Sequence, residues 1–320
     1  MHRQRTKFSH RFSRVFTSRS NGVAKALERS GIRATYKLHD RVLSNRSSRR
    51  LFAHDHPQLD EVQRRIVSEV DAEGFSLLPF SELFPEGAAW QELEAMRDRF
   101  VAETESDLAA GGEKVRVREG KEFVVRLHSY GVDVGLEDPW FRTCASRRML
   151  DIANASLRMW SKLEYVDVWY SVPQPAEASR ISSQRWHRDY NDKHLLKAFL
   201  YLVDVDEDMG PFQYVPGSQP GGRYADDWRW EPLGQNYPTE EELEARIPSS
   251  AVHTFVGPKA SLLFCNTAGF HRGGFSISKP RVLATVTYSS PASLASLTVQ
   301  SYRFTGALDE LDAPTQFALS

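Results

Sequence analysis

Cysteine is scarce in this sequence, which contains only Cys144 and Cys265 among its 320 residues. Two cysteines make a poor disulfide framework, so we expect both to be buried thiols in a reducing compartment. Long apolar runs are also missing: no stretch of about 18 apolar residues occurs, and no membrane-spanning helix is predicted. The sequence has no internal repeat and no glycine-rich loop that could cradle a phosphate, which argues against solenoid and nucleotide-binding proteins.

Acidic residues are nearly absent from the first 50 positions, although the whole chain has a net charge of only −1. Of the 41 lysines and arginines, 14 lie in residues 1–50 beside only Glu28 and Asp40, so this segment carries a charge of +12. The other 270 residues contain 27 basic and 40 acidic side chains. This asymmetry predicts a basic N-terminal arm, residues 1–50, attached to a single acidic domain, residues 51–320.

The role of the arm is open to several interpretations. A flexible, solvated segment fits its Arg- and Ser-rich composition, and Ser44–Arg50 has the composition of a linker. Apolar residues near helical spacing within residues 1–20 also fit a basic amphipathic helix that contacts a membrane surface or an acidic partner. Mitochondrial transit peptides have a similar composition, whereas nucleic acid is the least favoured partner. We expect a cytoplasmic protein, with a mitochondrial location as the alternative.

Hydrophobic patterning predicts a mainly β domain with flanking helices. Hydrophobic residues make up 41% of the chain and aromatic residues 11%, enough for a sizeable core. Apolar residues recur at helical spacing at 59–73, 88–105 and 140–160. Alternating or β-branched runs predict strands at 75–79, 122–128, 163–172, 197–205, 212–215, 260–265 and 282–288. We expect Met209–Gly210 to turn the strand 197–205 back into 212–215 as an antiparallel hairpin.

The stretch that points to chemistry is Arg185-Trp186-His187-Arg188-Asp189. Side chains two residues apart on a strand point to the same face, so His187 and Asp189 can reach one metal ion. His271 can complete the two-histidine, one-carboxylate triad that holds Fe(II) with open positions for substrate and dioxygen. Arg281, ten residues after His271, can clamp a carboxylate through two parallel hydrogen bonds. If only His187 and Asp189 are considered, the alternative to a metal site is an ordinary pair of surface side chains.

In these residues the chain resembles the phytanoyl-CoA dioxygenase family of Fe(II)- and 2-oxoglutarate-dependent oxygenases. The resemblance extends from about Gly74 to Tyr288. It rests on four blocks in the family's order, which are Gln184–Asp189, Met209–Ser218, Phe270–Gly274 and Arg281. The second block resembles a family hairpin that ends in Pro-Gly-Ser-His, but Gln219 replaces the histidine here. Because that position does not bind the metal in the family, the iron site is expected to be intact.

The resemblance implies an enzyme that hydroxylates a small or medium organic substrate, or desaturates or cyclises it, while 2-oxoglutarate is decarboxylated to succinate and CO2. It implies that His187, Asp189 and His271 bind Fe(II), with 2-oxoglutarate and O2 as co-substrates and ascorbate as an additive in vitro. Arg281 would bind the distal carboxylate of 2-oxoglutarate. The other residues that the resemblance assigns to the co-substrate are Gln184, Phe199 and Thr285. Leu283 occupies a position at which related enzymes often have Ser or Thr.

The last predicted strand supports a barrel. One face of this strand is largely polar and consists of Arg281, Leu283, Thr285 and Thr287. The opposite face is apolar and consists of Val282, Ala284, Val286 and Tyr288. Such a strand fits a barrel that holds a polar ligand inside and packs helices outside. The expected architecture is a double-stranded β-helix, a jelly-roll barrel of the cupin type. The long polar stretch 219–250, between the two halves of the metal site, is predicted to be a lid-like insertion.

Two other functions are compatible with the sequence. One is a catalytically silent, cupin-like binding protein, and the other is a metal-dependent barrel enzyme that does not use 2-oxoglutarate. The complete set of His187, Asp189 and His271 argues against the silent protein. The carboxylate of Asp189 also favours hydroxylation over halogenation, because related halogenases have a small residue there. Arg126 is expected to form a surface salt bridge, with contact to an anionic substrate as the alternative.

Overall fold

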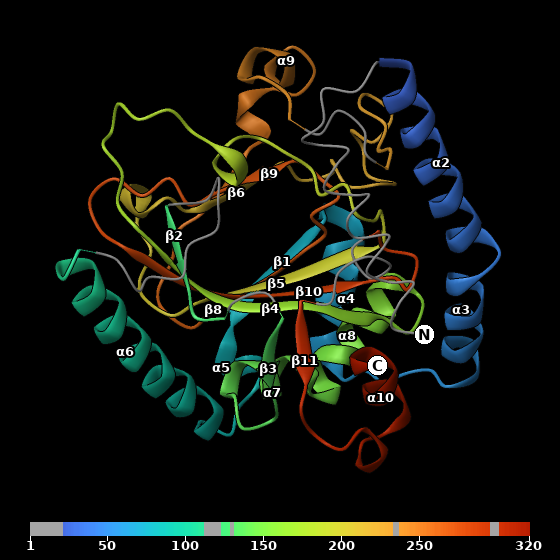
Figure 1. The fold of residues 1–320 in the computed structure, drawn as a ribbon, viewed down its shortest axis with the longest axis horizontal. Helices are drawn as coiled ribbons and strands as arrows, with labels where there is room; N and C mark the ends of the chain where they lie inside the picture. Colours follow the sequence, from blue (N-terminus) through green and yellow to red (C-terminus); the bar gives the residue numbers. More distant parts are fainter. Residues whose placement is uncertain (1–21, 112–122, 129–130, 233–236, 295–300) are drawn as a thin grey trace.

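Two antiparallel β-sheets form the centre of the structure, a computed structural model that describes residues 22–111, 123–128, 131–232, 237–294 and 301–320 (Figure 1). The six strands of the major sheet are, in order, β1 (Phe75–Pro79), β8 (Ser261–Cys265), β5 (Leu195–Tyr201), β10 (Arg281–Ser289), β4 (Lys162–Ser171) and β2 (Val124–Arg126). The minor sheet contains, in order, β7 (His253–Phe255), β6 (Phe212–Tyr214) and β9 (His271–Arg272). A bridge between His187 and His271 adds the segment around His187 to its edge. A separate parallel pair consists of β3 (Val132–Val134) and β11 (Tyr302–Phe304).

The chain alternates between the two sheets, and this alternation defines the fold. After β4 in the major sheet, the chain passes through the His187 segment in the minor sheet and returns to the major sheet in β5. Strands β6 and β7 belong to the minor sheet, β8 to the major, β9 to the minor and β10 to the major. This is the strand arrangement of a double-stranded β-helix. The predicted fold class, mainly β with flanking helices, is therefore confirmed.

The predicted hairpin between β5 and β6 is wrong, because the two strands belong to different sheets. Strand β6 pairs with β7 and β9 and not with β5. Gly210 adopts a left-handed conformation, with φ of 66°, which turns the chain from one sheet to the other. As a result, the rings of Phe199 and Phe212 meet across the interior with their centroids 4.8 Å apart.

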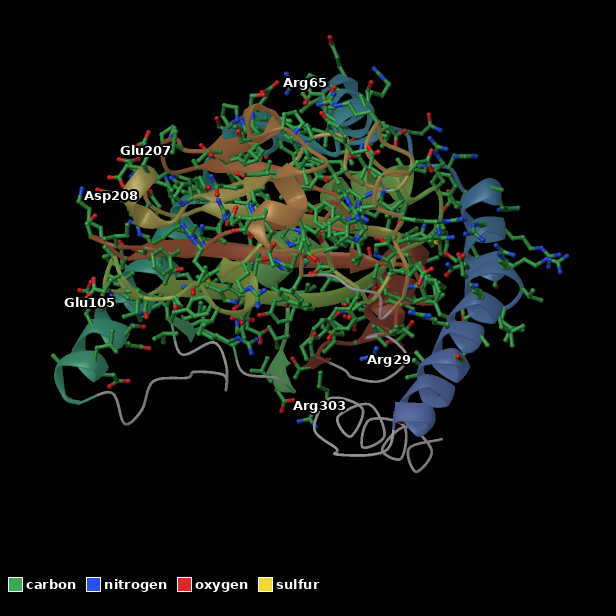
Figure 2. All side chains as sticks on the ribbon, turned by 90° about the horizontal axis from the view of Figure 1, so that it is seen from above. Arg29, Arg65, Glu105, Glu207, Asp208 and Arg303 are labelled. Atoms are coloured by element: carbon green, nitrogen blue, oxygen red, sulfur yellow. The ribbon has the colours of Figure 1, made fainter. Side chains whose placement is uncertain are left out.

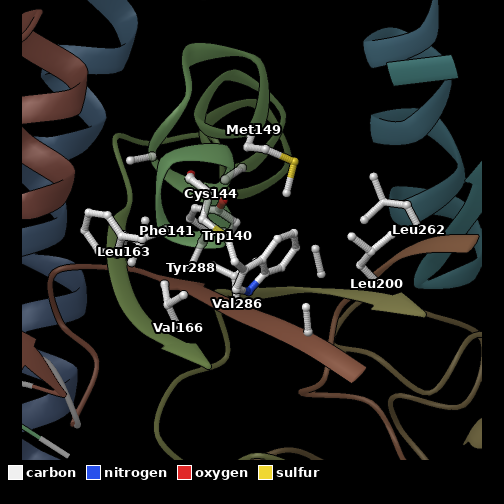
Figure 3. Close-up of a cluster of buried hydrophobic side chains, with 14 of the residues drawn as sticks. Trp140, Phe141, Cys144, Met149, Leu163, Val166, Leu200, Leu262, Val286 and Tyr288 are labelled. Carbon is white, nitrogen blue, oxygen red and sulfur yellow. Dashed lines mark hydrogen bonds between the residues drawn. The ribbon is translucent and has the colours of Figure 1, made fainter. Parts of the chain in front are cut away.

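Apolar side chains cover both faces of the major sheet. On the inner face, Phe199 belongs to a buried cluster that includes Phe212 of the minor sheet, so the two sheets pack face to face. On the outer face, Val286 packs into a second cluster with helix side chains such as Trp140 (Figure 3). The residues of β10 in this outer cluster are Val282, Ala284, Val286 and Tyr288, as the alternation of the strand predicts. Burial of these side chains supplies the main driving force for folding.

Helices surround the sheets (Figure 1). Their bounds are α2 (Gly22–Arg41), α3 (Ser44–His54), α4 (Glu61–Glu73), α5 (Phe80–Leu83), α6 (Ala88–Ala109), α7 (Pro139–Ala145), α8 (Arg147–Leu157), α9 (Glu240–Glu244) and α10 (Ala313–Leu319). The single helix predicted for residues 140–160 is in fact two. Ser146 separates them, because its side chain accepts a hydrogen bond from the backbone N–H of Met149 and so caps α8. Among the described residues, no helix has both the length and the apolar composition that crossing a bilayer requires.

The basic N-terminal segment is helical from Gly22 onward and docks on the domain. The linker predicted at Ser44–Arg50 is wrong, since these residues form most of α3. Tyr36 of α2 is buried and donates a hydrogen bond to Asp192 Oδ1 at 2.7 Å. Asp40 lies in ion pairs with Arg49 and Lys193, at 3.1 and 2.7 Å. The amphipathic helix predicted within residues 1–20 lies outside the described residues.

Candidate metal centre

Three side chains converge at the inner edge of the minor sheet. His187, Asp189 and His271 each offer one ligand atom, and these atoms all lie within 4.8 Å of one another. His271 Nε2 is 4.0 Å from Asp189 Oδ2, and the two imidazole centroids are 4.1 Å apart. Among the described residues, no other group of His, Cys, Asp or Glu has such an arrangement. The spacing of the donor atoms suits a single ion bound between them.

Backbone pairing brings the three residues together. His187 N donates to His271 O at 3.0 Å, and His271 N donates to His187 O at 2.9 Å. Two residues further along, Asp189 N donates to Thr267 O at 2.9 Å. The chain from His187 to Asp189 is therefore extended beside the segment before β9, and both side chains project from the same face. The His-x-Asp spacing and the distant His271 thus meet through one short antiparallel contact.

The two histidines are held in the tautomer that metal binding requires. His187 Nδ1 lies 2.9 Å from Arg185 O, and His271 Nδ1 lies 3.0 Å from Gly269 O. A carbonyl oxygen can only accept a hydrogen bond, so the proton of each neutral ring sits on Nδ1. Each Nε2 then carries the lone pair that could bind a metal. Backbone carbonyls in this second position also fix the orientation of the rings.

The charges at the centre leave the carboxylate ionised and His187 neutral. Burial, together with the neighbouring His271, lowers the pKa of His187 well below its ordinary value. Burial by itself raises the pKa of Asp189, but Lys197 and the two histidines outweigh it and hold that pKa below its ordinary value. Lys197 Nζ lies 2.6 Å from Asp189 Oδ2 as an ion pair, outside hydrogen-bond geometry. At neutral pH Asp189 and His187 are therefore in the protonation states of metal ligands.

A second group of buried polar side chains lies around Arg281, at the start of β10. The Arg281 side chain is only 3% exposed, and Nη1 donates to Gly210 O at 2.5 Å. Its Nε has no hydrogen-bond partner, and no acidic side chain pairs with it among the described residues. Burial lowers the pKa of this guanidinium, yet arginine stays charged in proteins. A buried cation without a counter-charge is costly, so the surroundings of Arg281 are suited to an anionic ligand.

Ser171 of β4 lies opposite Arg281 in the register of β4 and β10. Its hydroxyl is fully buried and has no hydrogen-bond partner among the described residues. A Cβ placed on Gly274 would come within 3.3 Å of Arg281 Nη2 and 3.9 Å of Ser171 Oγ. Glycine at this position therefore leaves space in front of both groups. The Arg281 guanidinium and the Ser171 hydroxyl both border this space and are donors that could bind a carboxylate.

The other residues expected at the co-substrate line the same interior. Thr285 and Phe199 are neighbours in the register of β10 and β5, and both are buried. Phe199 contacts Phe212, whose ring centroid is 5.6 Å from that of His271. Gln184 is buried as well, but its amide bonds to the backbone, accepting from Ile181 N at 3.0 Å and donating to Gly274 O at 3.3 Å. The roles of these residues stay predictions.

Lys197 and Ser171 are residues of the site that sequence reasoning missed. Lys197 is the single charged residue of the apolar strand β5, so its position on an otherwise apolar run was a signal. Ser171 gave no such signal, because it ends a long strand of mixed composition. Only the register of β4 against β10 brings its hydroxyl to Arg281.

The prediction of a surface salt bridge for Arg126 is wrong. Arg126 does form an ion pair, with Asp167, but the arginine is 8% exposed and the aspartate 0%. Arg126 Nη2 also donates to Tyr165 Oη at 2.9 Å, and Trp169 Nε1 donates to the same oxygen at 3.0 Å. The pairing of β2 with β4 carries Arg126 to the inner side of the major sheet, where Asp167 compensates its charge. It therefore belongs to the polar wall of the interior.

The chain matches a known protein family. The model of the phytanoyl-CoA dioxygenase family matches residues 83–275. This range includes His187, Asp189 and His271 and stops short of Arg281. No curated protein matches the chain.

Several solved structures are similar to this chain. The epimerase SnoN from nogalamycin biosynthesis, described as a non-heme alpha-ketoglutarate-dependent enzyme, has 18% sequence identity and a TM-score of 0.49, covering 77% of this chain and 89% of its own. EctD from S. alaskensis, solved with 2-oxoglutarate and 5-hydroxyectoine, has 17% identity and a TM-score of 0.49. The match covers 74% of this chain and 80% of EctD. HygX from Streptomyces hygroscopicus, solved with nickel, 2-oxoglutarate and hygromycin B, has 16% identity and a TM-score of 0.45, with 72% and 88% covered.

Proposed function

The chain belongs to the phytanoyl-CoA dioxygenase family, and we propose that it is an Fe(II)- and 2-oxoglutarate-dependent oxygenase that acts on a small or medium organic substrate. The observation that carries the proposal is the convergence of His187, Asp189 and His271 within 4.8 Å. Two neutral imidazoles and one carboxylate form the donor set of the facial triad that binds non-heme Fe(II).

The residues of the chain would divide the work between the metal and the co-substrate. His187, Asp189 and His271 would hold Fe(II) on one side and leave its other side open. Arg281, together with Ser171, would hold the distal carboxylate of 2-oxoglutarate, because both present buried donors without partners. When bound, the iron and 2-oxoglutarate supply the oxidation by O2, with release of succinate and CO2. The surrounding side chains orient the substrate and exclude water.

The reaction that we favour is hydroxylation. Asp189 supplies a carboxylate where related halogenases have a small residue, so halogenation is disfavoured. Desaturation and cyclisation use the same site and are the alternatives. The polar wall of Arg126, Tyr165, Asp167 and Trp169 is compatible with a substrate that carries polar groups, but these side chains already bond to one another.

The direct test is release of succinate from 2-oxoglutarate in the presence of Fe(II), ascorbate and O2. We expect slow release without a substrate and faster release with one. His187→Ala should abolish it, because the site loses one of its three donors. His253→Ala is the matched control, since this exposed imidazole on β7 should be dispensable.

The rival functions give different results in the same assay. A silent binding protein would release no succinate with any candidate substrate. A barrel enzyme that uses another oxidant would bind the metal but leave 2-oxoglutarate unchanged. Full turnover by His187→Ala would show that the ligand assignment is wrong. Screening substrates by succinate yield, with mass spectrometry for an added oxygen atom, would then identify the substrate.

For the basic N-terminal segment we propose contact with an anionic membrane surface, with an acidic protein as the alternative. Three exposed apolar side chains gather where α2 meets α3: Leu38 (49% exposed), Val42 (50%) and Leu43 (48%). Lys37, Arg41 and Arg46 are exposed and lie within three residues of them in the chain, and we call these six residues the α2–α3 corner. Figure 2 shows nitrogen-bearing side chains of α2 pointing away from the domain. Cations beside exposed apolar residues suit a surface that is negatively charged and apolar beneath.

A further inference from the structure

The segment that carries two of the proposed metal ligands is bonded, residue by residue, to the insertion between β6 and β7. We call residues 219–250 the insertion, of which 233–236 lie outside the described residues. Trp186 Nε1 donates to Glu240 Oε2 at 3.0 Å, and the His187 ring lies parallel to that of Tyr237, with centroids 5.5 Å apart and an angle of 11°. A lid that swung open would have to break these contacts.

The next two residues of the segment are bound to the insertion through the backbone. Arg188 is buried, and its guanidinium donates to Trp228 O and to Ser218 O. Trp230 Nε1 donates to Asp189 O at 2.9 Å. Since Asp189 N donates to Thr267 O, both backbone polar groups of Asp189 are bonded, one to the strand neighbour and one to the insertion. Among the described residues, the Trp230 bond is the one hydrogen bond that the insertion donates to the backbone of a proposed ligand.

Helix α2 holds the indole of Trp230 from the other side. The Tyr36 ring packs against it with centroids 5.6 Å apart, and Tyr36 also binds Asp192, three residues after Asp189. Arg33 Nε donates to Pro232 O at 3.2 Å and pairs with Glu231 at 3.3 Å. Trp230 therefore lies between the N-terminal helix and the backbone of Asp189.

We propose that Trp230 is a positioning residue for the metal site, and that α2 acts on the site through it. This inference rests on the proposed function. The indole N–H fixes the peptide plane after Asp189, and this plane helps to set the direction of the Asp189 carboxylate. Groups that orient a metal ligand affect metal affinity although they never touch the ion. The insertion is then a fixed support for the metal site. An ordered insertion strengthens metal binding, and a bound metal ion in turn stabilises the ordered insertion.

The test compares Trp230→Phe with Trp228→Phe in the full chain. Trp230→Phe keeps an aromatic ring against Tyr36 and removes only the donor. The control removes an indole whose N–H has no hydrogen bond among the described residues, while the backbone carbonyl that binds Arg188 remains. Affinity for Ni2+ is measured by calorimetry, which needs no turnover. We expect the Kd of Trp230→Phe to rise about tenfold, within the range of 10- to 100-fold known for such partners, and that of Trp228→Phe to stay within about twofold.

A spectroscopic readout separates positioning from general destabilisation. The visible absorption of Co2+ depends on the geometry of its ligands, so the bands should change in Trp230→Phe and not in Trp228→Phe. In the wild type, bound Ni2+ should also slow proteolysis of the insertion, and Trp230→Phe should lose most of this protection. The proteolysis measurement keeps the inference testable if Trp230→Phe folds poorly, since absence of protection in the wild type overturns it.

The outcomes distinguish this inference from the proposed function. If the wild type binds neither Ni2+ nor Co2+, the metal site is wrong and the inference falls with it. If the wild type binds both ions and Trp230→Phe matches it in affinity and spectrum, only the inference is overturned. Tyr36→Ala should weaken Ni2+ binding less than Trp230→Phe does, because it acts through the indole. Equal Ni2+ affinity in Tyr36→Ala and the wild type would overturn the part assigned to α2.

Discussion

Arg281 is a buried cation for which the described residues provide no anion, and Ser171 is a buried hydroxyl without a partner beside it. Each group costs stability in the free protein, because its hydration is lost and is not fully replaced: Arg281 keeps only the bond to Gly210 O, and Ser171 Oγ has no partner among the described residues. Both costs are offset when a carboxylate binds. At the scale of single residues, these two groups support the proposal that the site binds a carboxylate.

Replacing Arg281 with methionine should separate ligand binding from stability. Arg281→Met removes an unpaired buried charge, so we expect the ligand-free protein to become more stable by about 1 kcal/mol. Affinity for 2-oxoglutarate should fall by about 10- to 100-fold, since hydrogen bonds to charged groups are worth about 1.5–3 kcal/mol. Metal affinity should change much less. Thermal unfolding and calorimetry measure these three quantities.

The matched control for this variant is Arg303→Met, at an exposed arginine that pairs with Asp133. It should leave 2-oxoglutarate affinity unchanged. A destabilised Arg281→Met protein with normal 2-oxoglutarate affinity would show that Arg281 has a structural role and that the co-substrate binds elsewhere.

At the scale of elements, the junction of α4 and β1 illustrates how the minor sheet is held in place. Gly74 ends α4 in a left-handed conformation, with φ of 86°. Gly217 N donates to Glu73 O and Asn266 N donates to Gly74 O, at 3.0 and 2.8 Å. The loops that lead away from β6 and toward β9 are therefore anchored to this turn.

Gly74→Ala should destabilise the protein by about 2 kcal/mol or more. The left-handed conformation costs about 1 kcal/mol for alanine, and the added Cβ would lie 2.3 Å from the Tyr214 hydroxyl oxygen and 2.6 Å from Gln219 Oε1. Gly31→Ala is the control, because Gly31 lies within α2 and nothing lies within 4 Å of its added Cβ. It should be neutral or stabilising, by up to about 1 kcal/mol. A thermal midpoint for Gly74→Ala equal to that of the wild type would contradict the steric argument.

Asp40 of α2 pairs with Arg49 of α3 and with Lys193 of the domain, so we expect the docking of the two helices to depend on pH. Burial raises the pKa of Asp40, but His194 and Lys193 outweigh it and hold that pKa below its ordinary value. The ionised form therefore stabilises the folded state at any pH above the unfolded pKa of about 4, and this contribution is lost as the pH falls below that value. Asp40→Asn should thus lower the thermal midpoint at pH 7, and its difference from the wild type should shrink toward about pH 3.

Circular dichroism over this pH range measures the effect. Asp55→Asn, at an exposed aspartate just after α3, is the control and should behave as the wild type at every pH. A constant difference between Asp40→Asn and the wild type would mean that the charge of Asp40 does not carry the stabilisation.

At the scale of the whole molecule, charge is divided between the N-terminal segment and the rest of the chain. Residues 1–50 carry a charge of +12, whereas the net charge of the whole chain is −1. Some arginines of the basic segment form ion pairs within the folded structure, such as Arg33 with Glu231 and Arg49 with Asp40. The cations of the α2–α3 corner are exposed, and they lie beside three exposed apolar side chains in the chain.

Vesicle flotation tests whether this corner binds a membrane surface. The full chain should bind vesicles that contain phosphatidylglycerol and not vesicles of phosphatidylcholine alone, and added salt should weaken binding. Replacing Leu38 and Val42 with serine, or Lys37 and Arg41 with glutamine, should each reduce binding, by roughly fivefold per cation removed. Leu77→Ser and Lys259→Gln, at exposed positions elsewhere, are the controls. Binding that depends on the cations alone would favour an acidic protein partner instead.

The sequence by itself determined the element types, the fold class and the residues from which a site could be built. Alternation along β10 predicted its two faces, and the spacing of His187 and Asp189 predicted that both reach one point, because these patterns depend only on the geometry of a strand. Only the tertiary structure decided which sheet β6 joins, that Ser44–Arg50 is helical, that Lys197 and Ser171 lie at the site, and that Trp230 bonds to the backbone of Asp189. These features depend on pairing between segments far apart in the chain. Local composition cannot predict them, because strand register and burial are set by contacts between these distant segments.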